Sequence, residues 1–165
     1  MIQNRLTRRL AQLLCVGLLS ACASMPPPEL PADDARQRQL AANFIQALFS
    51  KQTEAVMASA GHPFYMNHQA ILSYPDELRR VLAQLFSNSQ VTPVEILEIQ
   101  PLDSLQFEAQ RPNDLARLFE YGFDGKLYWL LSLKLMPAGG QPQFEKVLLL
   151  LDPNNGKVVG FIQSR

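Results

Sequence analysis

Two apolar runs near the carboxyl end constrain the fold most, because their residues read as strands with apolar side chains on both faces. Within residues 127–135 every odd position is apolar, and within residues 147–151 all five positions are apolar. A sheet with one face in water alternates more cleanly than this. The odd positions of the first run are therefore expected to face helices. The outer face is expected to be partly covered around Leu130, Leu148 and Leu150.

Three different covers would suit this outer face. A loop, a tail or helix ends of the same chain would bury it without a partner. A second copy of the chain would make a homodimer through the sheet. A different partner protein would dock there in the same way, which makes these three leucines the candidate interface residues.

Three helices are expected before the strands. Residues 35–50 follow Asp33 and Asp34, either of which is a suitable cap, and carry an apolar stripe at helical spacing. Residues 53–60 predict a shorter helix that stops at Gly61. The third helix, residues 73–86, has the clearest pattern.

The third helix has both a start signal and an apolar face. Ser73 and Asp76 have the spacing of a capping box, and Pro75 falls in the first turn. Arg79 is expected to point to water. The apolar face is formed by Leu78, Leu82, Leu85 and Phe86.

The strands are expected mainly after residue 90, where the apolar period changes to two. Residues 62–73 read as short extended pieces around a turn, and residues 94–102 as a strand. Residues 114–137 predict two strands joined near Asp124–Gly125. Residues 144–163 predict a last hairpin that turns through "DPNNG".

This order of elements, with the local patterns "HPFYMN", "DELRRVL" and "LLLLDPNNGKVVGF", resembles the nuclear-transport-factor-two-like superfamily, also called SnoaL-like or cystatin-like. The resemblance implies a single α+β domain over residues 33–165. In that fold, amino-terminal helices pack in a strongly curved antiparallel sheet, and the resulting cone has an apolar pocket at its open end. Homodimers through the sheet are common in the superfamily.

The resemblance also implies where chemistry would lie. Enzymes of this superfamily place a carboxylate base with tyrosine donors, or a histidine with an aspartate, inside the cone. The candidate pocket-lining residues here are His62, Tyr65, Glu120, Tyr121 and Trp129. None of them carries an identifying motif, and a residue placed like Glu120 is more often a charge at a sheet edge or on the outer face.

No cofactor or metal is expected from the sequence. His62 and His68 are six residues apart, which matches no metal-site spacing. The chain also lacks a serine elbow, a phosphate-binding loop and a dinucleotide-binding glycine pattern. We therefore predict no catalytic residue.

The amino terminus predicts where the protein is located. Arg5, Arg8 and Arg9 precede a short apolar run, which is the layout of a secretory signal. The residues "LSAC" at 19–22 resemble the lipobox of bacterial lipoproteins, whose cysteine receives a lipid before the signal is cut off. The alternatives are an ordinary signal peptide and an apolar helix that happens to contain a cysteine. The lipobox implies a signal peptide over 1–21 and lipid on Cys22.

The segment that follows predicts a tether. Residues 22–32 contain four prolines and few large apolar side chains, so they form a linker rather than a core. Alanine rather than aspartate at position 23 favours the outer membrane. The chain is then anchored by lipid to the periplasmic side of that membrane.

Charge excludes nucleic acid as a partner. The chain has 15 basic and 15 acidic residues, and removal of residues 1–21 takes away three arginines, which leaves a net charge of about −3. The leading hypothesis is a non-catalytic lipoprotein whose domain binds a partner protein or a small apolar ligand. The alternatives are an isomerase- or dehydratase-like enzyme in the cone, and an assembly factor that docks onto an envelope protein complex.

Overall fold

The computed structural model describes residues 32–67, 70–111 and 113–164. The signal peptide, Cys22 and nearly all of the proline-rich linker predicted above lie outside these ranges. Residues Ala32–Arg165 form one compact unit. Within the described part, no helix is long and apolar enough to cross a membrane.

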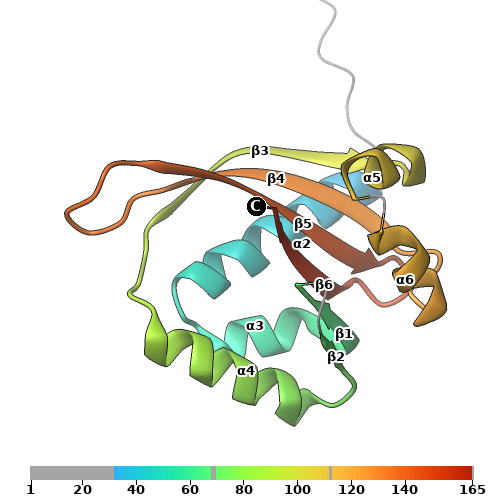
Figure 1. The fold of residues 1–165 in the computed structure, drawn as a ribbon, viewed down its shortest axis with the longest axis horizontal. Coiled ribbons are helices and arrows are strands. Elements are labelled where there is room, and N and C mark those ends of the chain that lie inside the picture. Colours follow the sequence, from blue (N-terminus) through green and yellow to red (C-terminus); the bar gives the residue numbers. More distant parts are fainter. Residues whose placement is uncertain (1–31, 68–69, 112, 165) are drawn as a thin grey trace, which may run out of the picture. The chain divides into compact units, whose positions relative to one another are not determined.

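The described residues form five helices and one six-stranded sheet, which confirms the α+β class (Figure 1). Neighbouring strands follow the order β2-β1-β6-β5-β4-β3. All pairs are antiparallel except β1 with β6, which is parallel. The elements in chain order are α2 (Ala32–Phe49), α3 (Thr53–Ser59), β1 (Ala60–Met66), β2 (Ala70–Leu72), α4 (Pro75–Asn88), β3 (Val94–Leu102), α5 (Ser104–Gln110), α6 (Asp114–Glu120), β4 (Leu127–Leu135), β5 (Gln143–Asp152) and β6 (Lys157–Ser164).

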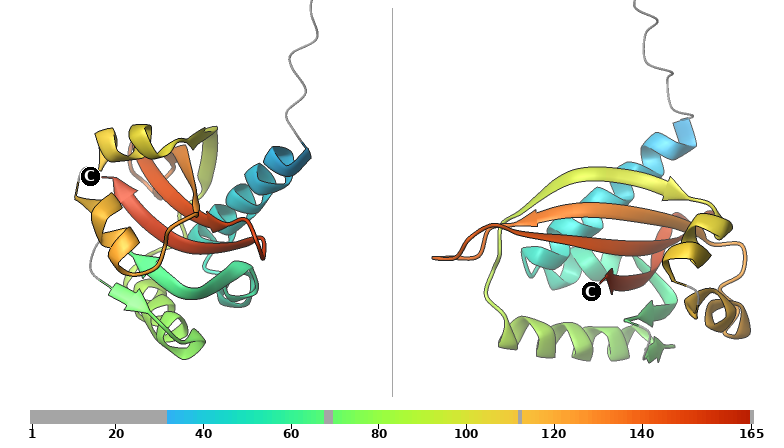
Figure 2. Two further views of the ribbon diagram at one scale, coloured as in Figure 1. Left: turned by 90° about the vertical axis from the view of Figure 1, so that its right-hand side faces the viewer. Right: turned by 45° about the horizontal axis from the view of Figure 1, so that its top comes forward.

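The three helices expected at the amino end all form, and they pack on one face of the sheet, here called the inner face. Figure 2 shows the strands curving across α2. Trp129 and the other odd positions of β4 face this side, as expected from their alternation, and pack with Phe44 of α2 and Leu82 of α4. The main apolar core therefore lies between α2–α4 and the inner face.

The opposite face of the sheet, here called the outer face, is covered by α5 and α6. Phe107 of α5 is fully buried, and its ring lies 4.3 Å from that of Tyr128 on β4. Leu115 and Leu118 of α6 belong to the same core. The outer face is therefore buried by its own chain around Tyr128, Leu130, Leu148 and Leu150, whereas Phe144 farther along β5 is 72% exposed.

This cover corrects the expected interface role of the outer-face leucines. Leu130, Leu148 and Leu150 are 3%, 1% and 0% exposed beneath the two helices. A partner on the outside of the molecule does not reach them. Of the three covers considered for this face, the same chain supplies it.

The expectation of a strand before Asp124 was wrong, because residues 114–120 form helix α6. Leu115 and Leu118 are three residues apart, which places them on one helix face, and both pack on the outer-face core. Helix α5 was also missed. Asp103 begins α5 with a capping box: its Oδ1 accepts from the backbone N–H of Gln106 at 2.7 Å, and Gln106 Oε1 accepts from the N–H of Asp103 at 3.0 Å.

Helix α4 forms as expected, but begins one residue later than the capping pattern indicated. Tyr74, not Ser73, is the cap residue, and Glu77 Oε2 accepts from its backbone N–H at 3.1 Å. Pro75 is the first helical residue. Its lack of an N–H costs nothing there, because the N–H groups of the first turn make no hydrogen bond within the helix. Leu85 is 46% exposed, so the buried face is narrower than expected.

Candidate functional site

An apolar pocket of about 260 Å³ lies between the carboxyl ends of α2 and α4 and the ends of β1 and β6. We call it the α2–α4 pocket. Its polar lining residues are Lys51, Asn67, Ser89, Thr92 and Gln163. Its apolar wall is formed by Leu48, Phe49, Met66, Leu85, Phe86 and Phe161.

The cation in this pocket is already bound by the protein. Lys51 Nζ donates to the backbone oxygen of Phe86 at 2.7 Å and also to that of Ser89. These carbonyls belong to the last turn of α4 and the residue that follows it, where a helix carries a partial negative charge. Lys51 therefore neutralises the end of α4.

The amides at the edge of the pocket are occupied in the same way. Asn67 Oδ1 accepts from the backbone N–H of Gln163 at 2.8 Å, which ties β1 to β6. The side-chain nitrogen of Gln163 donates to Glu145 Oε2 at 2.9 Å. The pocket therefore presents mainly apolar atoms and polar groups already bonded to the protein.

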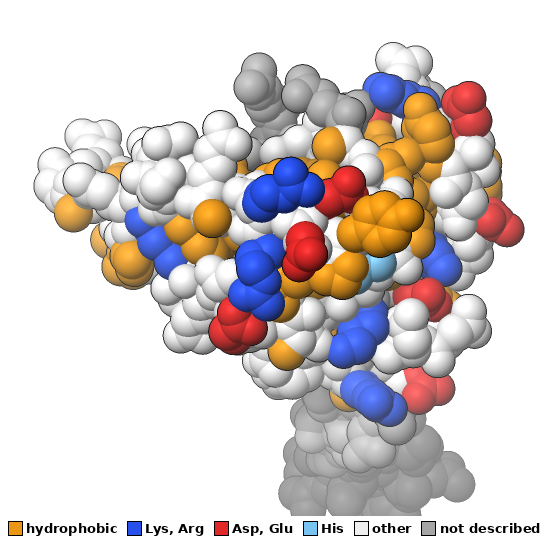
Figure 3. Space-filling view, turned by 90° about the horizontal axis from the view of Figure 1, so that it is seen from below, with side chains coloured by type: hydrophobic (Ala, Val, Ile, Leu, Met, Phe, Trp, Pro, Cys, Tyr) orange, Lys and Arg blue, Asp and Glu red, His pale blue; other side chains and the backbone are white. Residues whose placement is uncertain are grey.

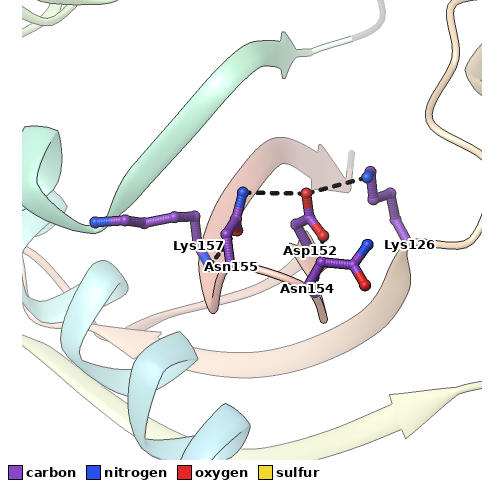
Figure 4. A network of polar contacts seen from close by, with 5 residues as sticks. All are labelled: Lys126, Asp152, Asn154, Asn155 and Lys157. Carbon is purple, nitrogen blue, oxygen red and sulfur yellow. Dashed lines mark hydrogen bonds and ion pairs between the residues drawn. The ribbon is translucent and has the colours of Figure 1, made fainter.

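A second, polar groove of about 430 Å³ lies between the start of α2 and the β5–β6 turn. Figure 4 shows the turn and its contacts. Asp152 Oδ2 accepts from Lys126 Nζ and from Asn155 Nδ2, each at 3.2 Å, and its Oδ1 accepts from the backbone N–H of Asn154 at 3.0 Å. Asn155 Oδ1 accepts from the N–H of Lys157 at 3.0 Å. These bonds hold the turn closed, which is a structural role.

The same contacts predict a pH dependence of stability. Burial alone would raise the pKa of the Asp152 carboxyl, but the Asn154 N–H and Lys126 outweigh it and lower that pKa. A lowered carboxyl pKa stabilises the fold above the unfolded pKa, and this part is lost as the pH falls from about 5 to about 3. Asp152→Asn should therefore lower the free energy of unfolding by about 1 kcal/mol at pH 7 and by less at pH 3.

Urea unfolding at the two pH values measures this effect. Lys126→Met should remove part of the same pH dependence, whereas Lys146→Met, an exposed lysine on β5, should leave it unchanged. A loss of stability in Asp152→Asn that is equal at both pH values would contradict the assignment.

The five pocket candidates from the sequence do not meet in one place. Trp129 lies on the inner face, whereas Tyr65 lies on the outer face against Phe123. Glu120 and Tyr121 are exposed at the end of α6. His62 is partly buried on β1, and none of the five lines either pocket described above.

The buried acid in the described part of the chain is Asp114, which the sequence analysis did not select. Asp114 is 6% exposed at the start of α6. Burial raises the pKa of the Tyr65 phenol, and the nearby charge of Asp114 raises it further. This acid–phenol pair lies on the outer face, away from the inner core.

Among the described residues, no group of three or more His, Cys, Asp or Glu side chains could hold a metal ion.

The face shown in Figure 3 carries Lys and Arg side chains interspersed with Asp and Glu side chains. Among the described residues, Arg79 of α4 is paired with Glu54 of α3. Such mixed charge gives no single-sign surface on this face, whereas nucleic-acid binding proteins carry a basic patch or stripe.

Comparison with solved structures identifies the fold. The chain is similar to ActVI-ORFA from Streptomyces coelicolor, with 10% sequence identity, a TM-score of 0.51, and coverage of 82% of this chain and 96% of that one. The domain has the nuclear-transport-factor-two-like fold, with a curved, unclosed sheet. At this identity the similarity shows the fold and not an activity.

Two further solved structures are similar at lower scores. TsrD from Streptomyces laurentii has 10% identity and a TM-score of 0.47, over 82% of this chain and 90% of that one. A putative polyketide cyclase from Xanthomonas campestris pv. campestris has 11% identity and a TM-score of 0.44, over 80% and 91%. No known family model matches the chain, and no curated protein matches it.

Proposed function

We propose that this protein is a non-catalytic binding protein that holds a small, neutral, apolar ligand in the α2–α4 pocket. The observation that carries the proposal is the hydrogen bonding of Lys51, the charged residue among those that line the pocket, whose ammonium group bonds to the end of α4. With the cation and the helix end neutralising each other, the pocket offers little to a charged ligand.

The pocket size also supports a small ligand. At about 260 Å³ it lies just below the roughly 300–1,000 Å³ that is usual for sites of drug-sized molecules. Apolar walls from α2, α4, β1 and β6 would exclude water around such a ligand, and transfer of its apolar surface from water would drive binding.

An enzyme of the isomerase or dehydratase kind is the second candidate. The observation in its favour is the buried Asp114 carboxyl beside the Tyr65 phenol. Neither residue lines the α2–α4 pocket, so the pair would need a site of its own on the outer face. For this reason binding stands first.

The neutral fluorescent probe N-phenyl-1-naphthylamine tests the binding proposal. We expect saturable binding of one probe per chain. Leu85→Arg should weaken it by about tenfold or more, because it replaces an apolar wall side chain with a larger, charged one that offers no favourable contact to an apolar ligand. Leu85 is already 46% exposed, so the variant should fold.

A matched control separates the pocket from other apolar surface. Leu105 on α5 is 77% exposed and lies outside the pocket, so Leu105→Arg should bind the probe like wild type. Equal probe binding by wild type and Leu85→Arg would contradict the proposal. If the protein chemically alters a natural ligand that it binds, the enzyme would be favoured instead.

We also propose that lipid on Cys22 tethers this domain to the periplasmic side of the outer membrane. The support is the "LSAC" pattern at residues 19–22 behind three arginines, followed by a proline-rich segment. Cys22→Ala should abolish incorporation of a labelled fatty acid and release the protein from the membrane fraction. A wild type that incorporates no fatty acid would contradict the anchor.

A further inference from the structure

A second polar feature lies on the inner face, where Arg38 of α2 reaches across to the sheet. Its Nη1 donates to the backbone oxygen of Ile99 on the edge strand β3 at 2.5 Å. Its guanidinium carbon lies 5.8 Å from the centre of the Trp129 ring, within the range of a cation–π contact. The Nε atom of Arg38 is buried and has no hydrogen-bond acceptor.

Trp129, the partner of Arg38 in this contact, also has an N–H group without an acceptor. Trp129 is 1% exposed, and its indole Nε1 is buried without a hydrogen-bond acceptor. A buried N–H that lacks an acceptor loses roughly 1–3 kcal/mol relative to water. Two such donors on one pair of contacting side chains indicate that an oxygen acceptor belongs beside them.

Because Arg38 is positively charged, the acceptor missing beside it is best supplied by an anion. The ion pairs within residues 32–67, 70–111 and 113–164 are Arg79 with Glu54, Lys126 with Asp152, and Lys134 with Glu95, so Arg38 has no acidic partner there. A partly buried cation without a counter-charge is unfavourable, whereas a guanidinium fork matches the two oxygens of a carboxylate.

We propose that Arg38 and Trp129 form a binding site for the carboxylate of a small organic acid. Arg38 would supply the charge and the Nε–H, and Trp129 the indole N–H. The site shares no residue with the α2–α4 pocket and does not depend on the function proposed for it.

The chain offers a direct probe, because Trp129 is its only tryptophan. Titration of the full chain with hexanoate should change the Trp129 emission in a saturable way. Hexanol has the same apolar chain without the charge, and should give no saturable change. Arg38→Gln should weaken hexanoate binding by about tenfold or more, because it removes the charged donors.

Arg36 supplies the matched control, since it is an exposed arginine two residues away on the same helix. Arg36→Gln should bind hexanoate like wild type. If Arg38→Gln does not fold, Arg38→Lys keeps the charge but loses the fork, and should bind more weakly than wild type. The proposal fails if wild type shows no saturable response, if hexanol gives the same response, or if the folded Arg38 variants bind as tightly as wild type.

Discussion

Phe107→Ala should lower the free energy of unfolding by about 3–5 kcal/mol, which is the usual range for loss of a buried phenylalanine. The side chain is fully buried between α5 and the outer face of the sheet, stacked on Tyr128 at 4.3 Å. Chemical denaturation monitored by circular dichroism measures the change. The size of the effect reports whether α5 covers the sheet in solution.

The control for this change is on the same short helix. Leu105 is two residues away and 77% exposed, so Leu105→Ala should change stability by less than about 0.5 kcal/mol. Similar small effects at Leu105 and Phe107 would mean that α5 does not pack on the outer face. That face would then again be open to a partner.

Leu82→Ala should cost about 2–5 kcal/mol, because Leu82 is fully buried where α4 packs on the inner core. Arg79, one turn earlier on the same helix, is exposed and paired with Glu54. Arg79→Ala should change stability far less than Leu82→Ala, because an exposed ion pair contributes little. Equal losses at the two positions, measured by urea unfolding, would contradict the assigned face of α4.

Helix α4 could be predicted from the sequence because its signals are local. Pro75 at the first helical position and the buried pair Leu78 and Leu82 agree with the helical period read from the chain. The inner face of β4 could be predicted for the same reason, since side chains on a strand alternate between faces. Such patterns depend on residues only two to four positions apart.

Helices α5 and α6 show where this reasoning fails. Phe119, Tyr121 and Phe123 alternate like a strand, and the turn at Asp124–Gly125 suggested a hairpin. As a helix, residues 114–120 place both Leu115 and Leu118 against the apolar outer face of the sheet. This tertiary packing outweighs the local preference for a strand. The capping box at Asp103 and Gln106 was the sequence signal that could have revealed α5.

The candidate pockets could not be predicted because their walls come from distant parts of the chain. The α2–α4 pocket joins residues near 50, 66, 86 and 161, which only the parallel pairing of β1 with β6 and the packing of α4 bring together. The hydrogen bonds from Lys51 to the carbonyls at the end of α4 likewise could not be predicted from the sequence. Tyr65 and Trp129, by contrast, were placed together but lie on opposite faces of the sheet.

The most direct test of ligand binding is a methyl NMR titration of the full chain with N-phenyl-1-naphthylamine. Shifts that saturate at the methyl groups of Leu48 and Leu85, which line the α2–α4 pocket, are the result we expect. The methyl groups of Leu148 and Leu150, buried beneath α5 and α6, should stay unchanged. Unchanged Leu48 and Leu85 methyl groups, or larger shifts at the outer-face leucines, would contradict the α2–α4 pocket as the ligand site.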